Sequence, residues 1–141
     1  MEKIPLFTLI ILLLFGCKKP QQPIESGLII SIQKGNTGVW SMIDIWDTQG
    51  HEMTIEPTTA MSGYAMDKVL NHNVPATVQA ANAYYKVKLP DGTYLVFVAI
   101  SPTGPGQLAY SYKTFTVKDG YTIANKKFSD NVTNGAYEVW Q

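Results

Sequence analysis

The fold of this chain is decided by YYKVKLPDGTYLVFVAI, which spans residues 84–100. Its centre, Pro90-Asp91-Gly92, is a turn triplet in which proline fixes φ, aspartate caps the backbone and glycine accepts a positive φ. The flanking segments are rich in β-branched and aromatic residues, so we predict two strands, 84–89 and 93–100, joined as a hairpin. Residues 93–100 are apolar on both faces, which indicates a central strand covered on both sides.

Other segments show the same two-residue alternation between turn residues. Strands are predicted at 27–32, 39–47, 51–56, 108–117, 121–128 and 136–140, with 39–47 as the hairpin partner of 27–32. No long helical pattern separates them. The chain is therefore predicted to form an all-β fold, an antiparallel β-sandwich of about seven strands, Ig-like or transthyretin-like.

Residues 57–83 fit two patterns about equally well. Ala65, Met66, Val69 and Leu70 lie on one face of a helix for which Ser62 is a possible N-cap, whereas Tyr64, Met66 and Lys68 fit a strand. We expect a short helix or an irregular crossover near 62–70, and we leave 77–81 unassigned.

The amino-terminal stretch is typical of a secretory signal. An apolar run of roughly 12 residues, from Ile4 to Phe15, is shorter than the about 20 residues that a membrane-spanning helix needs. Leu14-Phe15-Gly16-Cys17 resembles the lipobox of bacterial lipoproteins, which implies a lipidated Cys17 as the mature amino terminus. We therefore expect a signal peptide (1–16), the lipidated cysteine with a flexible tether (17–26) and one β-sandwich domain (27–141).

This resemblance predicts a place in the bacterial cell envelope, where the lipid anchor holds the protein on a membrane. Whether that surface is periplasmic or external is left open. Cys17 is the only cysteine, so no intramolecular disulfide is expected. The formal net charge is +0 and all eleven basic residues are lysines. Because the chain has no arginine to form bidentate contacts with phosphates or base edges, nucleic acid is not an expected partner.

The turn at Leu89-Pro90-Asp91-Gly92-Thr93-Tyr94-Leu95-Val96 resembles one hairpin of transthyretin-like sandwiches of the carboxypeptidase regulatory type, which often carry Leu-Pro-x-Gly-x-Tyr-x-Val there. The usual opening of that family, with its Gly-x-Pro-Leu-x-Gly-Ala stretch, is absent here. The resemblance implies architecture alone, because one fold hosts many functions.

No residue pattern indicates catalysis. The only histidines are His51 and His72, and neither accompanies a nucleophile motif such as Gly-x-Ser-x-Gly. His51-Glu52 begins like a zinc-protease motif, but Ile55 stands where the second histidine belongs. We therefore predict no enzyme activity, metal or cofactor. A small hydrolase with scattered residues such as Asp44, His51 and His72 remains an alternative.

The candidate binding surface is aromatic. Trp40, Met42, Asp44 and Trp46 share one face of the strand at 39–47, and Ser41, Ile43 and Ile45 share the other. If the isoleucines face the core, two indoles about 20 Å apart are exposed and suit separate sugars or a protein partner. The opposing interpretation is that this face packs beneath a second sheet or a crossover and buries Asp44.

Location and composition together favour a non-catalytic lipoprotein that acts as a binding or structural module. The alternative from a second class is a glycan-binding component of a polysaccharide-capture system, using Trp40, Asp44 and Trp46.

Overall fold

The computed structural model describes residues 19–141, which form eleven strands and one short helix. Their bounds are β1 (Gly27–Lys34), β2 (Thr37–Gly38), β3 (Ser41–Asp47), β4 (Met53–Thr54), α1 (Pro57–Ala60), β5 (Tyr64–Asp67), β6 (His72–Pro75), β7 (Val78–Ala81), β8 (Tyr84–Lys88), β9 (Gly92–Ile100), β10 (Ala109–Val117) and β11 (Tyr121–Phe128). The predicted signal peptide and the lipidation site at Cys17 lie outside the described residues.

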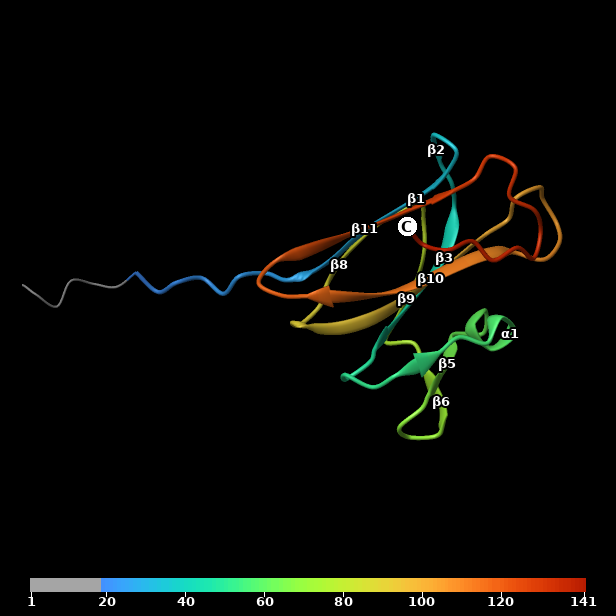
Figure 1. The fold of residues 1–141 in the computed structure, drawn as a ribbon. Coiled ribbons are helices and arrows are strands. Elements are labelled where there is room, and N and C mark those ends of the chain that lie inside the picture. Colours follow the sequence, from blue (N-terminus) through green and yellow to red (C-terminus); the bar gives the residue numbers. More distant parts are fainter. Residues whose placement is uncertain (1–18) are drawn as a thin grey trace, which may run out of the picture.

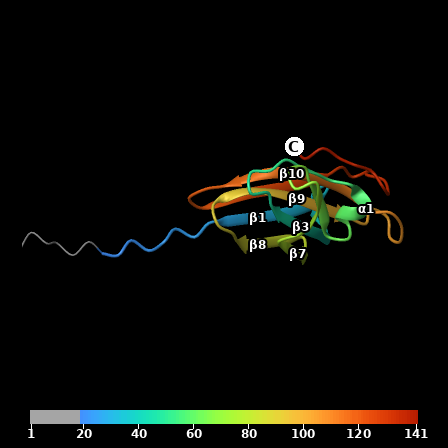
Figure 2. The same cartoon turned by 90° about the horizontal axis from the view of Figure 1, so that it is seen from below.

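Two four-stranded sheets pack face to face, which confirms the predicted all-β sandwich (Figure 1). In one sheet, β1 lies between β8 and β11 and also pairs with β2; in the other, the order is β10-β9-β3-β7. All ladders are antiparallel except that between β1 and β11, which is parallel. Seen from below, the amino-terminal segment leaves the sandwich at the end opposite α1 (Figure 2).

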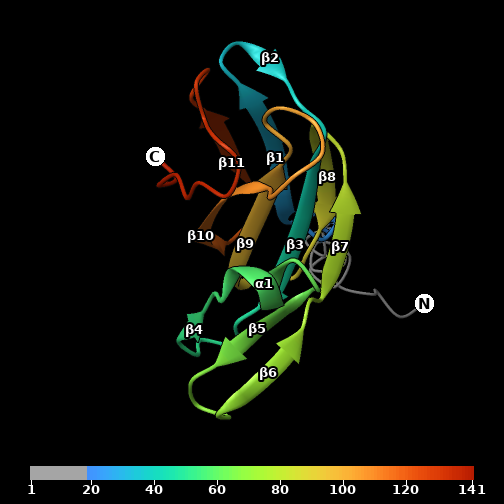
Figure 3. The ribbon, with the colours of Figure 1, turned by 90° about the vertical axis from the view of Figure 1, so that its right-hand side faces the viewer.

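A small third sheet, β4-β5-β6, covers part of the outer face of the β10-β9-β3-β7 sheet and protrudes beyond the sandwich (Figure 3). Two apolar clusters result. The main core between the two large sheets includes Ile30, Ile43 and Val98, and a second core beneath the small sheet includes Trp46 and Phe97.

The strand β9 contributes to both cores. Its alternate residues enter opposite clusters, with Val96 in the main core and Leu95 and Phe97 in the second. The sequence-based prediction of a central strand covered on both faces is therefore confirmed. The small sheet covers the face of β9 that points away from the main core. The apolar residues on both faces of β9 are therefore buried.

The predicted hairpin at Pro90-Asp91-Gly92 is wrong in its pairing. β8 pairs with β1, whereas β9 pairs with β10 and β3, so the turn carries the chain from one sheet to the other. The Tyr94 hydroxyl, at the start of β9, donates a 2.8 Å hydrogen bond to the carbonyl oxygen of Pro90. This arrangement is the tyrosine corner found in Ig-like sandwiches, where it fixes such a crossing between sheets.

Replacing Tyr94 with phenylalanine is expected to lower the free energy of unfolding by about 1 kcal/mol, because the buried corner loses one hydrogen bond and keeps its packing. Urea unfolding measures the difference. Tyr84→Phe is the matched control, since Tyr84 is 55% exposed and should show no loss. Equal stability of the Tyr94→Phe variant and the wild type would refute the role given to this corner.

Two further pairings differ from the sequence-based prediction. Residues 39–47 were expected to pair with the first strand, but β1 pairs instead with the two-residue β2, which precedes this segment. The strand β3 lies in the other sheet and pairs with β9 and β7. Residues 136–140 were expected to form a last strand. They make a single β-bridge, between Tyr137 and Tyr110, and so do not continue as a strand along the edge of β10.

The helix expected near 62–70 is also misplaced. The helix is α1, which has Pro57 at its start, and Gly63 follows it with φ +82°, a backbone conformation that favours glycine. Residues 64–67 then form β5, with Ala65 and Asp67 buried and Tyr64 exposed. The strand alternation was thus the correct one of the two patterns, because Gly63 separates residues 64–70 from the helix.

Candidate functional site

The strongest candidate site is an open groove of about 430 Å³ on the outer face of the β10-β9-β3-β7 sheet, beside the small sheet. We call it the Trp40 groove. It is lined by Trp40, Met42 and Asp44 at β3, by Met61 after α1, and by Gln79, Ala80 and Ala81 of β7. β3 and β7 are neighbouring strands, and their ladder places Asp44 directly opposite Gln79.

The two indoles predicted on this face have different environments. Trp40 is 62% exposed, whereas Trp46 is 1% exposed beneath the small sheet, where its Nε1 donates to the Val74 carbonyl oxygen at 3.1 Å. Ile43 and Ile45 point into the main core, as expected. The predicted pair of exposed indoles is therefore not formed, because the small sheet covers one of them. The opposing interpretation, packing beneath a crossover, holds for Trp46 and for Asp44.

Asp44 has an unusual environment for a carboxylate. The residue is 1% exposed, and its Oδ2 is one of two buried side-chain atoms without a hydrogen-bond partner among residues 19–141, the other being Ser111 Oγ. Burial raises the pKa of the Asp44 carboxyl, and a hydrogen bond from the Gln79 amide partly opposes that rise. A buried charge without a partner lowers the stability of the fold, so stability does not explain why a carboxylate occupies this position.

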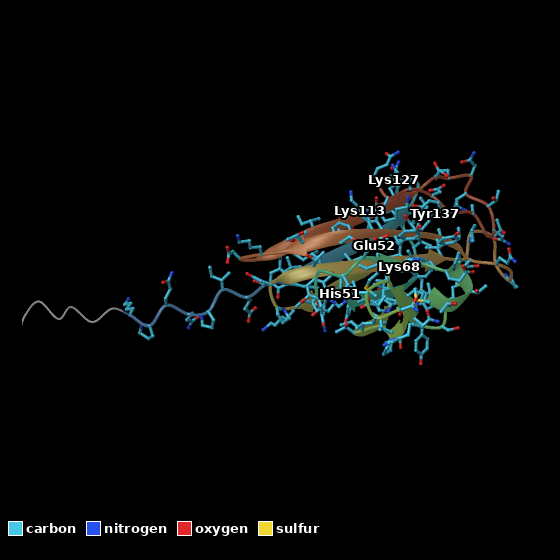
Figure 4. The ribbon with its side chains drawn as sticks, turned by 60° about the horizontal axis from the view of Figure 1, so that its bottom comes forward. His51, Glu52, Lys68, Lys113, Lys127 and Tyr137 are labelled. Atoms are coloured by element: carbon cyan, nitrogen blue, oxygen red, sulfur yellow. The ribbon has the colours of Figure 1, made fainter. Side chains whose placement is uncertain are left out.

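A second polar cluster lies on the small sheet, where Figure 4 shows His51, Glu52 and Lys68. His51 Nδ1 lies 2.8 Å from Asp67 Oδ2, and Asp67 Oδ1 accepts hydrogen bonds from the backbone N–H groups of Val69 and Leu70. Each carboxylate oxygen of Asp67 thus has a structural partner. The cluster holds β4 and the β5–β6 turn together, and neither histidine lines the Trp40 groove.

This cluster predicts a pH dependence of stability. The hydrogen bond with His51, followed by that with the Leu70 backbone, lowers the pKa of Asp67. A carboxyl whose pKa is lower in the folded state stabilises the fold above its unfolded value of about 3.9, and that stabilisation is lost as the pH falls through the lowered value.

Thermal unfolding between pH 7 and pH 2 is the measurement. Asp67→Asn is expected to unfold below the wild-type temperature at neutral pH, and the two curves should converge at the acid end. Asp130→Asn, at an exposed position, is the control and should follow the wild type. A constant difference between Asp67→Asn and the wild type at every pH would show that the carboxylate charge is not responsible.

A larger hollow, of about 580 Å³, lies between β11 and the carboxyl-terminal segment. Its buried lysine, Lys126, donates to the Val139 carbonyl oxygen at 2.9 Å and lies 3.6 Å from Glu138 Oε2. Trp140 Nε1 donates to the Asn125 carbonyl oxygen at 2.7 Å beside it. These groups fasten the carboxyl-terminal segment to β11, so their partners are already supplied by the chain.

Within the described part of the chain, no three histidine, cysteine, aspartate or glutamate side chains come close enough to hold a metal ion. None of its helices has the length and apolar character of a membrane span. Comparisons with protein-family models, with curated proteins and with solved structures find no match to this chain. The interpretation of the site therefore depends on its own geometry.

The sequence pattern identified Trp40 and Asp44 but missed Met61 and Gln79. Met61 follows α1 and Gln79 lies in β7, within the segment for which two patterns competed. The alternation of Val78, Gln79 and Ala80 is the signal that indicates a strand there. The alternation does not indicate the partner of this strand. The position of Gln79 opposite Asp44 was therefore not predictable from the sequence pattern.

Proposed function

We propose that this protein is a non-catalytic binding module of the bacterial cell envelope, anchored to a membrane through a lipidated Cys17. The sequence Leu14-Phe15-Gly16-Cys17 supports the anchor, and residues 19–25, which are exposed and lack regular structure, suit a tether. The observation that carries the binding role is the Trp40 groove, which is lined both by an exposed indole and by a buried carboxylate with one oxygen lacking a hydrogen-bond partner.

The anchor is tested by fractionation and mass spectrometry of the mature protein. The wild type should sediment with membranes and carry acyl chains on Cys17, whereas Cys17→Ala should be released from the membrane fraction. Recovery of wild-type protein with an uncleaved, unmodified amino terminus would contradict the proposed anchor and would leave the binding role to be judged separately.

The binding role is tested by placing a photo-crosslinking amino acid at position 40 in living cells. We expect a crosslinked product of defined composition at position 40 and none at position 123, which is equally exposed but lies on β11 in the other large sheet. Identical crosslinking from both positions would indicate random collisions and would contradict a binding site at the groove.

Glycan binding is the second candidate, and the exposed face of Trp40 beside Gln79 and Asp44 favours it. A sugar stacks its apolar C–H face on an indole while its hydroxyls bond to amides and carboxylates. Because Trp46 is buried, the groove offers one aromatic platform and suits a single sugar unit. A glycan array with the wild type and Trp40→Ala tests this candidate, and binding that survives the substitution would reject it.

A further inference from the structure

We propose that the Trp40 groove binds a protonated primary amine, with the Asp44 carboxylate as its counter-ion and the Trp40 indole as its aromatic wall. The inference rests on the proposed binding function and assigns a ligand class to the same groove. A lysine side chain and an amino sugar both present this chemical group, and the experiment below distinguishes these sources.

The groove carries an uncompensated negative charge. Among residues 19–141, Asp44 is the only charged residue that lines the groove, and no lysine of that part of the chain lines it to compensate the charge. Its Oδ2 has no hydrogen-bond donor and is buried from solvent. An ammonium group supplies both a hydrogen-bond donor and the opposite charge, and charge-assisted hydrogen bonds of this kind are stronger than neutral ones.

The remaining walls of the groove suit the rest of an amine ligand. Trp40 lies four residues from Asp44 along the strand, about 13 Å at roughly 3.3 Å per residue, so its indole suits the apolar body of a ligand whose ammonium group lies at Asp44. Met42 and Met61 add polarizable thioethers that adapt to the apolar stem of an alkylamine. The amide of Gln79 carries an oxygen that accepts a further N–H group.

Access to Asp44 involves the side chain of Gln79. Gln79 lies opposite Asp44 in the ladder and is itself exposed, so its side chain is the cover that a ligand can displace. Gly63 provides the space for it, since a Cβ at Gly63 would lie 2.3 Å from Gln79 Nε2. The Gln79 side chain also donates a hydrogen bond to the Asp44 carboxyl, and an ammonium group that displaces this side chain replaces that bond with a charged one.

The test uses the full-length protein in detergent micelles and records the indole N–H signals of its three tryptophans by NMR. The Trp46 and Trp140 indoles each donate to a backbone carbonyl group, so they report on folding, and Trp40 reports on the groove. The probes are Nα-acetyl-lysine amide and glucosamine. Their matched neutral controls are Nα-acetyl-norleucine amide and N-acetylglucosamine.

We expect at least one amine to shift the Trp40 signal and to bind at least about tenfold more tightly than its neutral control, a difference of about 1.4 kcal/mol. Asp44→Asn should reduce that affinity at least tenfold with the Trp46 and Trp140 signals unchanged. Asp47→Asn, on the same strand but exposed, should not. A response to one amine alone identifies the source as peptide or as amino sugar.

Two results would overturn the inference. If N-acetylglucosamine binds as tightly as glucosamine and the lysine derivative binds no more tightly than its norleucine control, the groove is a neutral-sugar site, and glycan binding survives without the ammonium. If neither amine shifts the Trp40 signal, the amine ligand is rejected, while crosslinking at position 40 still decides whether the groove binds a partner at all.

Discussion

Trp46→Ala is expected to lower the free energy of unfolding by about 3–5 kcal/mol, the range for deletion of a large buried aromatic side chain. Trp46 lies at the end of β3, 1% exposed, in the core beneath the small sheet. Its Nε1 donates to the Val74 carbonyl oxygen of β6, 28 residues further along the chain. The substitution therefore removes apolar packing and also leaves a backbone carbonyl group without its partner.

Chemical unfolding gives the global loss, and hydrogen exchange shows where it acts. Amides of β5 and β6 should lose protection more than those of β1, because Trp46 belongs to the second core and β1 to the first. Trp40→Ala, on the same face of the same segment, is the control and should change stability by less than about 0.5 kcal/mol. If Trp46→Ala and Trp40→Ala have equal effects, the small sheet is not held by Trp46.

The sequence predicted which segments are strands better than it predicted their partners. The segments 121–128 and 93–100 were found almost to the residue, because their composition and alternation are local properties. The turn at Pro90-Asp91-Gly92 was also found, yet it connects strands of different sheets. A turn sequence specifies the reversal of the chain, but which strands then pair depends on contacts distant in sequence.

In the candidate site, too, local properties were predictable and contacts distant in sequence were not. The alternation along β3 placed Trp40, Asp44 and Trp46 on one face and the isoleucines on the other, as the structure has them. Which part of that face is covered depends on the small sheet, built from residues for which helical and strand patterns competed. The small sheet determines that Trp46 is buried and Trp40 is exposed. The alternation along the strand therefore could not predict this difference.

Asp44→Leu is expected to raise the free energy of unfolding at neutral pH by about 1–3 kcal/mol, because it replaces a buried carboxylate lacking a full set of partners with an apolar side chain of the same branched shape. Asp44 pairs across the ladder with Phe97 of the second core, so leucine has apolar neighbours to contact. Most core substitutions destabilise, so a gain at a 1% exposed position is a distinctive result.

The pH dependence should have the opposite sign to that of Asp67. Burial raises the pKa of Asp44, so the folded state takes up its proton before the unfolded state does. The stabilisation from that proton is fully present below the unfolded pKa of about 3.9 and is lost as the pH rises through the raised folded pKa. The advantage of Asp44→Leu over the wild type should therefore be largest at neutral pH and shrink on acidification, as thermal unfolding at each pH will show.

A loss of stability in Asp44→Leu would mean that the carboxylate already has favourable partners in the free protein, which would remove the charge argument for an amine in the groove. Asp47→Leu, at the exposed end of the same strand, controls for the change in side-chain type. A variant that gains stability and loses amine binding would separate the two roles of Asp44. The carboxylate would then be a group that destabilises the empty groove and stabilises the occupied one, as expected where a binding site and the stability of its fold make opposing demands on a single residue.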